Sequence, residues 1–245
     1  MPGKQFPSFA AAVADIPDGA TIAFGGFAMP GTPFNLIAAL AEHGARGLTL
    51  IANTTGGAQQ PRMPDIGMLV ERGQVRKVIC AFTAATRASD VLPFTKYYES
   101  GEVEAELVPQ GTLAERLRAA GAGIPAFYTP TAVGTELAEG RETRVIDGRE
   151  YLLEYALPVD YAFLRARRAD TFGNLLFHRS QRNFNPVMAT AARIAIAEVE
   201  EPILPAGAID PDAVHTSGIF VHRLVEIPPP PAGLWPQKRQ ERVRP

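Results

Sequence analysis

The fold is decided near the N-terminus, where the chain reads Asp18-Gly19-Ala20-Thr21-Ile22-Ala23-Phe24-Gly25-Gly26-Phe27-Ala28-Met29-Pro30-Gly31-Thr32-Pro33. An Asp-Gly turn leads into a short apolar strand over 21–24, and a glycine loop then runs into a helix that starts near Pro33. Glycine lacks a Cβ and tolerates positive φ, so backbone amides in such a loop can approach an anion closely. This order of strand, loop and helix predicts the first unit of an α/β sheet.

The glycine loop also has an interpretation without a ligand, because a Gly-Gly pair after a strand is common turn chemistry. Its spacing is not G-x-G-x-x-G, and the next predicted strand ends in Asn53 with no acidic residue to bind a ribose. Dinucleotide binding is therefore disfavoured.

Short apolar runs alternate with segments of helical periodicity through the rest of the first half. The predicted strands are 21–24, 48–53, 77–82, 105–108 and 126–128, and the predicted helices are 34–42, 66–72 and 113–119. The strands are nearly continuous apolar runs, as is typical of sheets that are covered on both faces. We therefore expect an α/β fold: an open, mostly parallel sheet with helices on both faces.

The second half predicts antiparallel additions at the edges of that sheet. Asp147-Gly148 separates two short strands and favours a tight hairpin turn. Further strands are predicted over 159–165, 174–177 and 193–199, and a helix over 186–192. Residues 1–227 are expected to form a single domain, followed by a proline-rich, basic tail over 228–245 that is extended or mobile.

Composition narrows the class of protein. The 245 residues include 24 Lys and Arg against 26 Asp and Glu, so no basic surplus exists for nucleic acid or an anionic membrane. No apolar run is long enough to span a membrane, and no export signal is evident. A single cysteine, Cys80, excludes an internal disulfide and suggests the cytoplasm; we expect it to be a small core residue. The four histidines lack the spacing of metal ligands, so no metal is expected.

Five ordered motifs resemble the α (A) subunit of family I coenzyme A transferases. They are the stretch quoted above, 106–116, 121–130, Gly173-Asn174-Leu175, and Asn183-Phe184-Asn185-Pro186 with Ala189-Thr190-Ala191 behind it. Each motif is weak alone, whereas the five in this order are specific. The resemblance covers roughly residues 6–227 and implies the fold of that family, which is related to the NagB and RpiA folds.

The resemblance implies an enzyme that moves CoA between an acyl-CoA and a carboxylic acid, expected to be a 3-oxo acid. A glutamate carboxylate attacks the thioester in this family, and in two-chain members it belongs to the B subunit. This chain lacks the Glu-Asn-Gly type of loop; Glu99 and Glu136 are its nearest candidates and are expected to be surface carboxylates. The resemblance thus implies a partner B subunit, an α2β2 assembly, a coenzyme A thioester as substrate and no permanently bound cofactor.

The resemblance also implies which residues of this chain form the wall of the active-site groove. Asn53 and Gln110 correspond to polar side chains that face the reacting carbonyl, and both follow strands at the carboxyl edge of the sheet. Without the family, strand-end capping is the simpler interpretation of both. The expected lining near the thioester and pantetheine is Gly25, Gly26, Phe27 and Gly31, although Phe27 could equally belong to the core.

Some positions depart from the family pattern. Thr54-Thr55-Gly56-Gly57 stands where a second Asn followed by Ala-Gly is common, and Cys80 begins a run unlike the usual Ser-Tyr-Val-Gly type. The acid that the enzyme accepts is therefore left open. Arg165, Arg167 and Arg168 could meet a CoA phosphate or an acidic partner, but short charge runs usually face water.

Two other functions are compatible with the same scaffold. One is an acyl-CoA hydrolase or lyase subunit, in which water or an altered acceptor pocket replaces the second acid. The other is a non-catalytic ligand-sensing domain, because fold alone does not imply catalysis.

Overall fold

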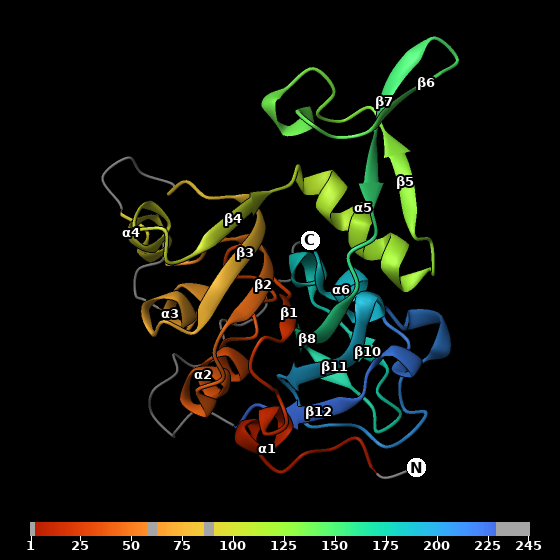
Figure 1. Cartoon of the computed structure of the whole chain (residues 1–245). Helices are drawn as coiled ribbons and strands as arrows, with labels where there is room; N and C mark the ends of the chain where they lie inside the picture. Colours follow the sequence, from red (N-terminus) through yellow and green to blue (C-terminus); the bar gives the residue numbers. More distant parts are fainter. Residues whose placement is uncertain (1–2, 58–62, 86–90, 229–245) are drawn as a thin grey trace, which may run out of the picture.

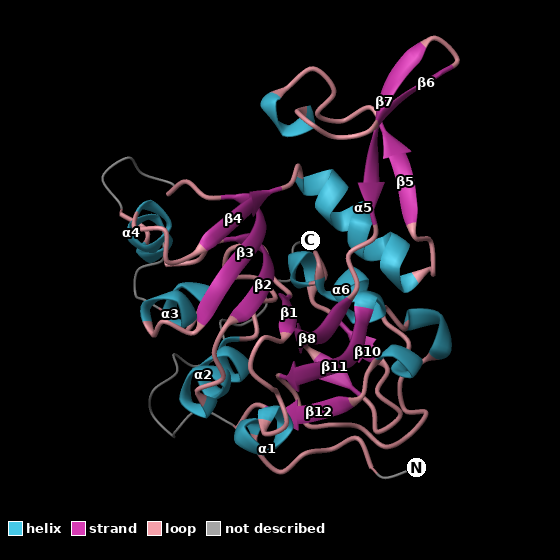
Figure 2. Ribbon diagram, viewed as in Figure 1, coloured by secondary structure: helices cyan, strands magenta, loops and turns pink. Residues whose placement is uncertain are grey.

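A computed structural model of the chain describes residues 3–57, 63–85 and 91–228. Its centre is a seven-stranded sheet in the order β12-β11-β8-β1-β2-β3-β4, in which every neighbouring pair is parallel. The strands are β1 (Thr21–Phe24), β2 (Leu48–Thr54), β3 (Val75–Phe82), β4 (Glu104–Leu107), β8 (Val159–Ala166), β11 (Ala192–Val199) and β12 (Arg223–Glu226). The α/β class predicted from the sequence is confirmed (Figures 1 and 2).

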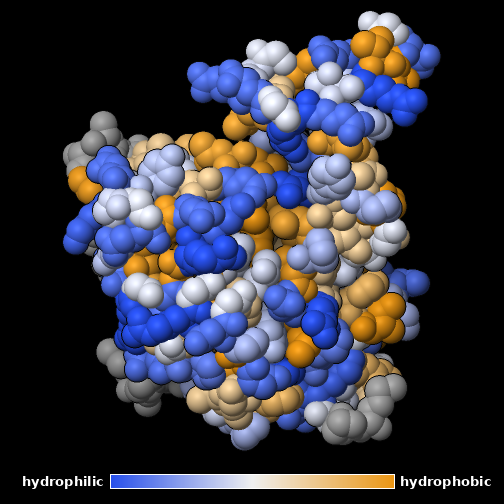
Figure 3. Space-filling view, viewed as in Figure 1, coloured by the Kyte–Doolittle hydropathy of each residue, from blue (hydrophilic) through white to orange (hydrophobic). Residues whose placement is uncertain are grey.

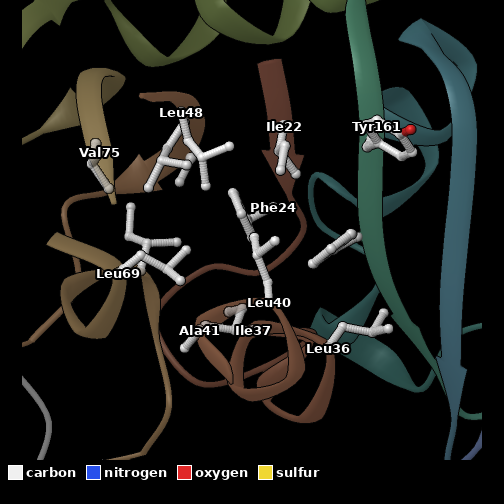
Figure 4. Close-up of a cluster of buried hydrophobic side chains, with 14 of the residues drawn as sticks. Ile22, Phe24, Leu36, Ile37, Leu40, Ala41, Leu48, Leu69, Val75 and Tyr161 are labelled. Atoms are coloured by element: carbon white, nitrogen blue, oxygen red, sulfur yellow. The ribbon is translucent and has the colours of Figure 1, made fainter. Parts of the chain in front are cut away.

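Four helices cover one face of this sheet. They are α1 (Phe9–Val13), α2 (Phe34–His43), α3 (Ile66–Glu71) and α4 (Pro93–Glu99). The stripe Leu36, Ile37 and Leu40 of α2 is fully buried against Ile22 and Phe24 of β1 (Figure 4). Helix α2 ends at His43, and Gly44, with a positive φ of 83°, forms its left-handed C-cap.

The opposite face is covered by α5 (Gln110–Gly121) and α6 (Asn185–Ala191). Because side chains alternate along a strand, Ile22 and Phe24 face the first core whereas Ala23 faces the second. The second core contains Leu113 and Leu117 of α5 together with residues of α6, β8 and β11. Helices on both faces explain why the strand runs in the sequence were almost wholly apolar.

The antiparallel strands form small separate sheets and not edges of the main one, which corrects one expectation. Strands β5 (Ala126–Thr129), β7 (Arg149–Tyr155) and β6 (Thr143–Ile146) pair antiparallel in a sheet that projects from the body (Figure 1). Strands β9 (Arg168–Ala169) and β10 (Leu175–Leu176) form a second, two-stranded antiparallel sheet. Strand β5 was expected among the parallel strands, but its residues are only half-buried, which suits an outlying sheet.

The hairpin turn between β6 and β7 is confirmed. Asp147 has φ 51° and Gly148 has φ 76°, as a type I′ turn requires at both central residues. The elements that the sequence did not predict include α1, α4 and β12. The tail expected over 228–245 lies outside the described residues except for Pro228. Over the described ranges, the structure holds no helix of sufficient length and hydrophobicity to cross a bilayer.

Candidate active site

Asn53 and Gln110 meet at the carboxyl edge of the main sheet. Asn53 is the penultimate residue of β2, and Gln110 is the first residue of α5, shortly after β4. The strands are parallel, so their carboxyl ends lie at one edge although 57 residues separate the two side chains. Gln110 Nε2 donates a hydrogen bond of 2.6 Å to Asn53 Oδ1.

That hydrogen bond determines what Asn53 can offer a ligand. With its Oδ1 occupied by Gln110, the remaining polar group of the amide is Nδ2, which can only donate. Asn53 is 5% exposed, and its Nδ2 makes no hydrogen bond with any of the described residues. The pair therefore presents an oriented, uncharged donor in a largely dry site.

A cavity of about 180 Å³ opens beside Asn53. The glycine loop contributes Gly25, Gly26 and Ala28 to its wall, whereas Phe27, Gly31 and Gln110 are not among its lining residues. Phe27 is 48% exposed, so the alternative that it belongs to the core is wrong. The remaining wall comes mainly from β1, α2 and the segments that follow β2 and β3: Phe24, Thr32, Ile37, Ala52, Asn53, Thr54, Thr55, Gly56, Asp65, Ile66, Phe82, Ala84 and Leu92.

Asp65 holds the loop that follows β2. Its Oδ1 accepts from Gly67 N at 3.0 Å and caps α3, while its Oδ2 accepts from Gly57 N at 2.7 Å. A Cβ at Gly56, whose φ is +74°, would lie 2.7 Å from Asp65 Oδ1. Both oxygens of this carboxylate are thus used in shaping the cavity wall.

Thr55 brings an unusual polar atom to the same wall. The residue is fully buried, and its hydroxyl has no hydrogen-bond partner in the part of the chain that the structure describes. Such an orphaned buried hydroxyl is uncommon in folded proteins. It lies in the Thr54-Thr55-Gly56-Gly57 segment, which departs from the family pattern.

The most perturbed carboxylate, Glu198, lies behind the glycine loop. It is fully buried on β11 and accepts from Asn35 N at 2.9 Å and Leu36 N at 3.0 Å, at the start of α2. Arg165 Nη1 approaches its Oε1 at 3.3 Å. Burial raises the pKa of Glu198 to about 7 against the opposing effect of Arg165.

Other candidates from the sequence have structural roles. Arg165 pairs with Glu198 and Glu200, while Arg167 and Arg168 share Glu201, so all three arginines have carboxylate partners within the chain. Cys80 is fully buried, as expected of a core residue, and burial raises its thiol pKa to about 11.

The carboxylates considered as nucleophiles lie on the surface. Glu99 at the end of α4 and Glu136 in the projecting region are both exposed, which confirms the prediction for each. Within the described ranges, no cluster of three or more His, Cys, Asp or Glu side chains could hold a metal ion.

Comparison with known proteins identifies the family of the chain. The family model described as coenzyme A transferase matches residues 6–227. The chain belongs to the coenzyme A transferase family. It is 47% identical over 229 residues to the A subunit of the 3-oxoadipate CoA-transferase of Pseudomonas putida, covering 93% of this chain and 95% of the relative. It is 48% identical to the A subunit of the succinyl-CoA:3-ketoacid coenzyme A transferase of Xanthomonas campestris pv. campestris, covering 97% and 92%.

Solved structures share the fold of this coenzyme A transferase family member. The decarboxylase AibA/AibB, solved as a cysteine-to-serine variant, is 30% identical with a TM-score of 0.75, covering 96% of this chain and 89% of that one. Glutaconate coenzyme A-transferase from Acidaminococcus fermentans shares the fold at 23% identity and a TM-score of 0.76, covering 92% and 76%. The family and fold expected from the sequence motifs are therefore confirmed.

Sequence reasoning on this coenzyme A transferase missed several residues around the cavity. Asn183 and Asn185 lie in one of the family motifs, but the sequence does not indicate which groups their side chains contact, and Glu198 resembles any acid near the end of a strand. Thr55 was noticed only as a departure from the family. A polar residue inside an otherwise apolar strand segment, as in the run 194–199, is the signal that could have singled out Glu198.

Proposed function

We propose that this chain is the A subunit of an enzyme that transfers CoA between an acyl-CoA and a 3-oxo acid, with the nucleophilic glutamate supplied by a partner B subunit. The observation that carries the proposal is the Gln110–Asn53 hydrogen bond of 2.6 Å beside the cavity, in a chain of this family. It leaves Asn53 Nδ2 as an oriented donor.

The oriented amide suits the chemistry of acyl transfer. When a carboxylate attacks the thioester carbonyl, the carbonyl oxygen gains negative charge and CoA leaves as the thiolate, which gives an acyl-glutamyl anhydride. The thiolate then attacks the glutamyl carbonyl, so the first acid departs and a glutamyl thioester remains; the acceptor acid reverses these steps. Asn53 Nδ2 would donate to the developing oxyanion, and Gln110 would keep the amide from rotating.

Exposed apolar side chains support a binding surface around the cavity. Phe27 and Met29 of the glycine loop are 48% and 47% exposed, and Phe82 at the end of β3 is 46% exposed. An apolar rim of this kind would contact pantetheine and exclude water from the anhydride. Gly25 and Gly26 would line the thioester side, with Gly31 shaping the loop behind them.

A second chain is supported by the relatives, whose names describe each of them as one subunit of an enzyme. The projecting sheet gives further support, because Val145 is 67% exposed and Tyr155 is 62% exposed. Figure 3 shows apolar side chains at the surface of this projecting part. We propose the α2β2 assembly for this chain and its partner.

Reconstitution with the partner tests the function. CoA transfer from succinyl-CoA to 3-oxobutanoate and to 3-oxoadipate would be followed for the wild type and for Asn53→Ala, Gln110→Ala and Gln5→Ala. Loss of the oxyanion donor should lower kcat about 10²-fold or more for Asn53→Ala. Gln5 is an exposed amide at the far N-terminal segment, and its variant should retain wild-type turnover. Wild-type kcat in Asn53→Ala would show that Asn53 is not the oxyanion donor, and absence of CoA transfer in the reconstituted wild type would favour a ligand sensor.

A decarboxylase or related lyase is the second candidate, because the AibA/AibB decarboxylase matches 96% of this chain. Release of CO₂ or free CoA without formation of a new acyl-CoA would identify a lyase or a hydrolase. Formation of the second acyl-CoA in equal amount to the acid released would identify the transferase.

A further inference from the structure

We infer that Asn183 and Asn185 are positioning residues of this enzyme, because their side chains hold the glycine loop in the shape that lines the cavity. Their effect on turnover rests on the proposed function, whereas their effect on the loop follows from contacts within the chain.

Asn185 fastens the far end of the loop to the sheet. Its side chain is fully buried; Nδ2 donates to Gly31 O at 3.1 Å and to Gln181 O at 2.9 Å. Its Oδ1 accepts from Arg165 N at 3.0 Å, at the carboxyl end of β8. One amide thus uses both its donor and its acceptor to join the loop, the 3₁₀ turn Arg179–Gln181 and the central sheet.

The Asn183 side chain bridges two positions of the same loop, Gly26 and Pro30. Its Oδ1 accepts from Gly26 N at 3.1 Å, and its Nδ2 donates to Pro30 O at 2.8 Å and to Ser180 O at 2.7 Å. The two loop contacts lie four residues apart, so a single side chain sets the width of the loop. More than 150 residues of sequence separate the asparagine from the loop that it holds.

Asn185 also explains why glycine stands at position 25 of the loop. A Cβ on Gly25 would lie 2.1 Å from Asn185 Oδ1, and its three nearest atoms all belong to Asn185. Gly25 is not among the residues with positive φ, so its backbone would accept alanine. Gly31 differs, because its φ of +78° itself favours glycine and a Cβ there would lie 2.5 Å from Gln181 O as well as 2.6 Å from Asn185 Nδ2. Gly25 is therefore a glycine because the Asn185 side chain occupies the space, not because a ligand approaches it.

The bent shape needs this support. Gly26 has φ 113°, and Ala28, which has a Cβ, has φ 55°, a conformation that persists only where the surroundings impose it. Gly25, Gly26 and Ala28 are also the loop residues that line the cavity beside Asn53. A loop released by loss of an asparagine would relax and change the cavity wall.

A double-mutant cycle between positions 25 and 185 distinguishes two reasons for the glycine at position 25: the space that the Asn185 side chain occupies, and the close approach of a ligand. CoA transfer from succinyl-CoA to 3-oxobutanoate is measured on the enzyme assembled with its partner. We expect Gly25→Ala to lower kcat/KM about 10²-fold in the wild type, but less than about threefold in the Asn185→Ala background, where the space is free. An equal loss in both backgrounds would mean that a ligand requires the glycine and would overturn the inference.

The thermal midpoints of the same four proteins give a readout that needs no activity. Gly25→Ala should lower the midpoint strongly when Asn185 is present and little in the Asn185→Ala background, and additive shifts would contradict the inference. If the wild type transfers no CoA, the proposed function fails while this cycle still tests the loop. If Asn185→Ala does not fold, Asn185→Ser provides a partial cycle: its Oγ must turn away from the position of Cγ, which is 2.6 Å from the added Cβ, and the effect of Gly25→Ala should then be smaller than in the wild type.

Asn183→Ala tests the positioning role, with Asn174→Ala as its matched control. Asn174 is also a half-buried bridging amide, since it donates to Asp170 at 3.0 Å and accepts from Gly218 N at 2.9 Å, and neither of these partners belongs to the loop. Both variants should lose stability, but only Asn183→Ala should lower kcat, by about tenfold or more, with KM changed less. Equal kcat values for the two variants would leave Asn183 with a structural role only and overturn its assignment.

Discussion

Thr55 carries a buried hydroxyl that the described part of its own chain does not satisfy. Removing such a group while keeping the shape of the side chain relieves a desolvation penalty. We therefore expect Thr55→Val to raise the free energy of unfolding by about 1 kcal/mol, measured by urea denaturation. Thr190→Val, at a half-buried threonine whose hydroxyl donates to Val187 O at 2.8 Å, serves as the control and should not gain stability. A loss of stability in Thr55→Val would show that the hydroxyl has a partner in solution.

The burial of Cys80 predicts that its thiol reacts slowly in the folded protein. Burial raises its thiol pKa to about 11, so almost no thiolate forms near neutral pH. We expect no alkylation by iodoacetamide at about pH 8 in the folded protein, and full alkylation after denaturation, both read by mass spectrometry. Rapid labelling of the native protein would contradict this burial, whereas Cys80→Ala should retain CoA transfer.

At the scale of elements, Glu198 links β11 to the start of α2, the helix that follows the glycine loop. Its pKa rises from the usual 4.5 to about 7, so folding favours the protonated form. The stability from this group is therefore complete below pH 4.5 and is lost as the pH rises through 7. The charged groups near this carboxylate are Arg165, which pairs with it, and Glu200, which pairs with the same arginine.

This shift predicts a specific pH dependence. Between about pH 4.5 and pH 8, the wild type should lose up to about 3 kcal/mol of unfolding free energy relative to Glu198→Gln, whose amide does not titrate. Urea denaturation of both proteins at several pH values measures the difference. Parallel pH profiles would show that the carboxylate keeps an ordinary pKa.

At the scale of the whole molecule, we propose that the active site forms between this chain, which supplies the amide donor, and a partner chain, which supplies the glutamate. If the glutamate belongs to the partner, incubation of the assembled enzyme with acyl-CoA followed by borohydride should modify the partner alone. Peptide mapping by mass spectrometry locates the modified residue. A reduced thioester at Glu99, Glu136 or any other residue of this chain would refute the two-chain mechanism.

Much of the fold was predictable because it depends on local pattern. Apolar runs bounded by glycine and polar turns marked β1, β2 and β3 to within two residues, and Asp147-Gly148 defined the hairpin turn. Short elements escaped, since the five residues of α1 and the four of β12 carry too little periodicity to be recognised. The pairing of β5 with β7 also escaped, because strand partners are chosen by tertiary contacts.

The sequence by itself determined the α/β class, the family and the two amides at the carboxyl edge, since strand patterns and ordered motifs are properties of neighbouring residues. Only the tertiary structure decided that Gln110 orients Asn53, that Asn185 fills the space above Gly25, and that Glu198 lies buried behind α2. These contacts join residues 57 to 163 positions apart. Their energies depend on distance and burial, which no local pattern of residues records.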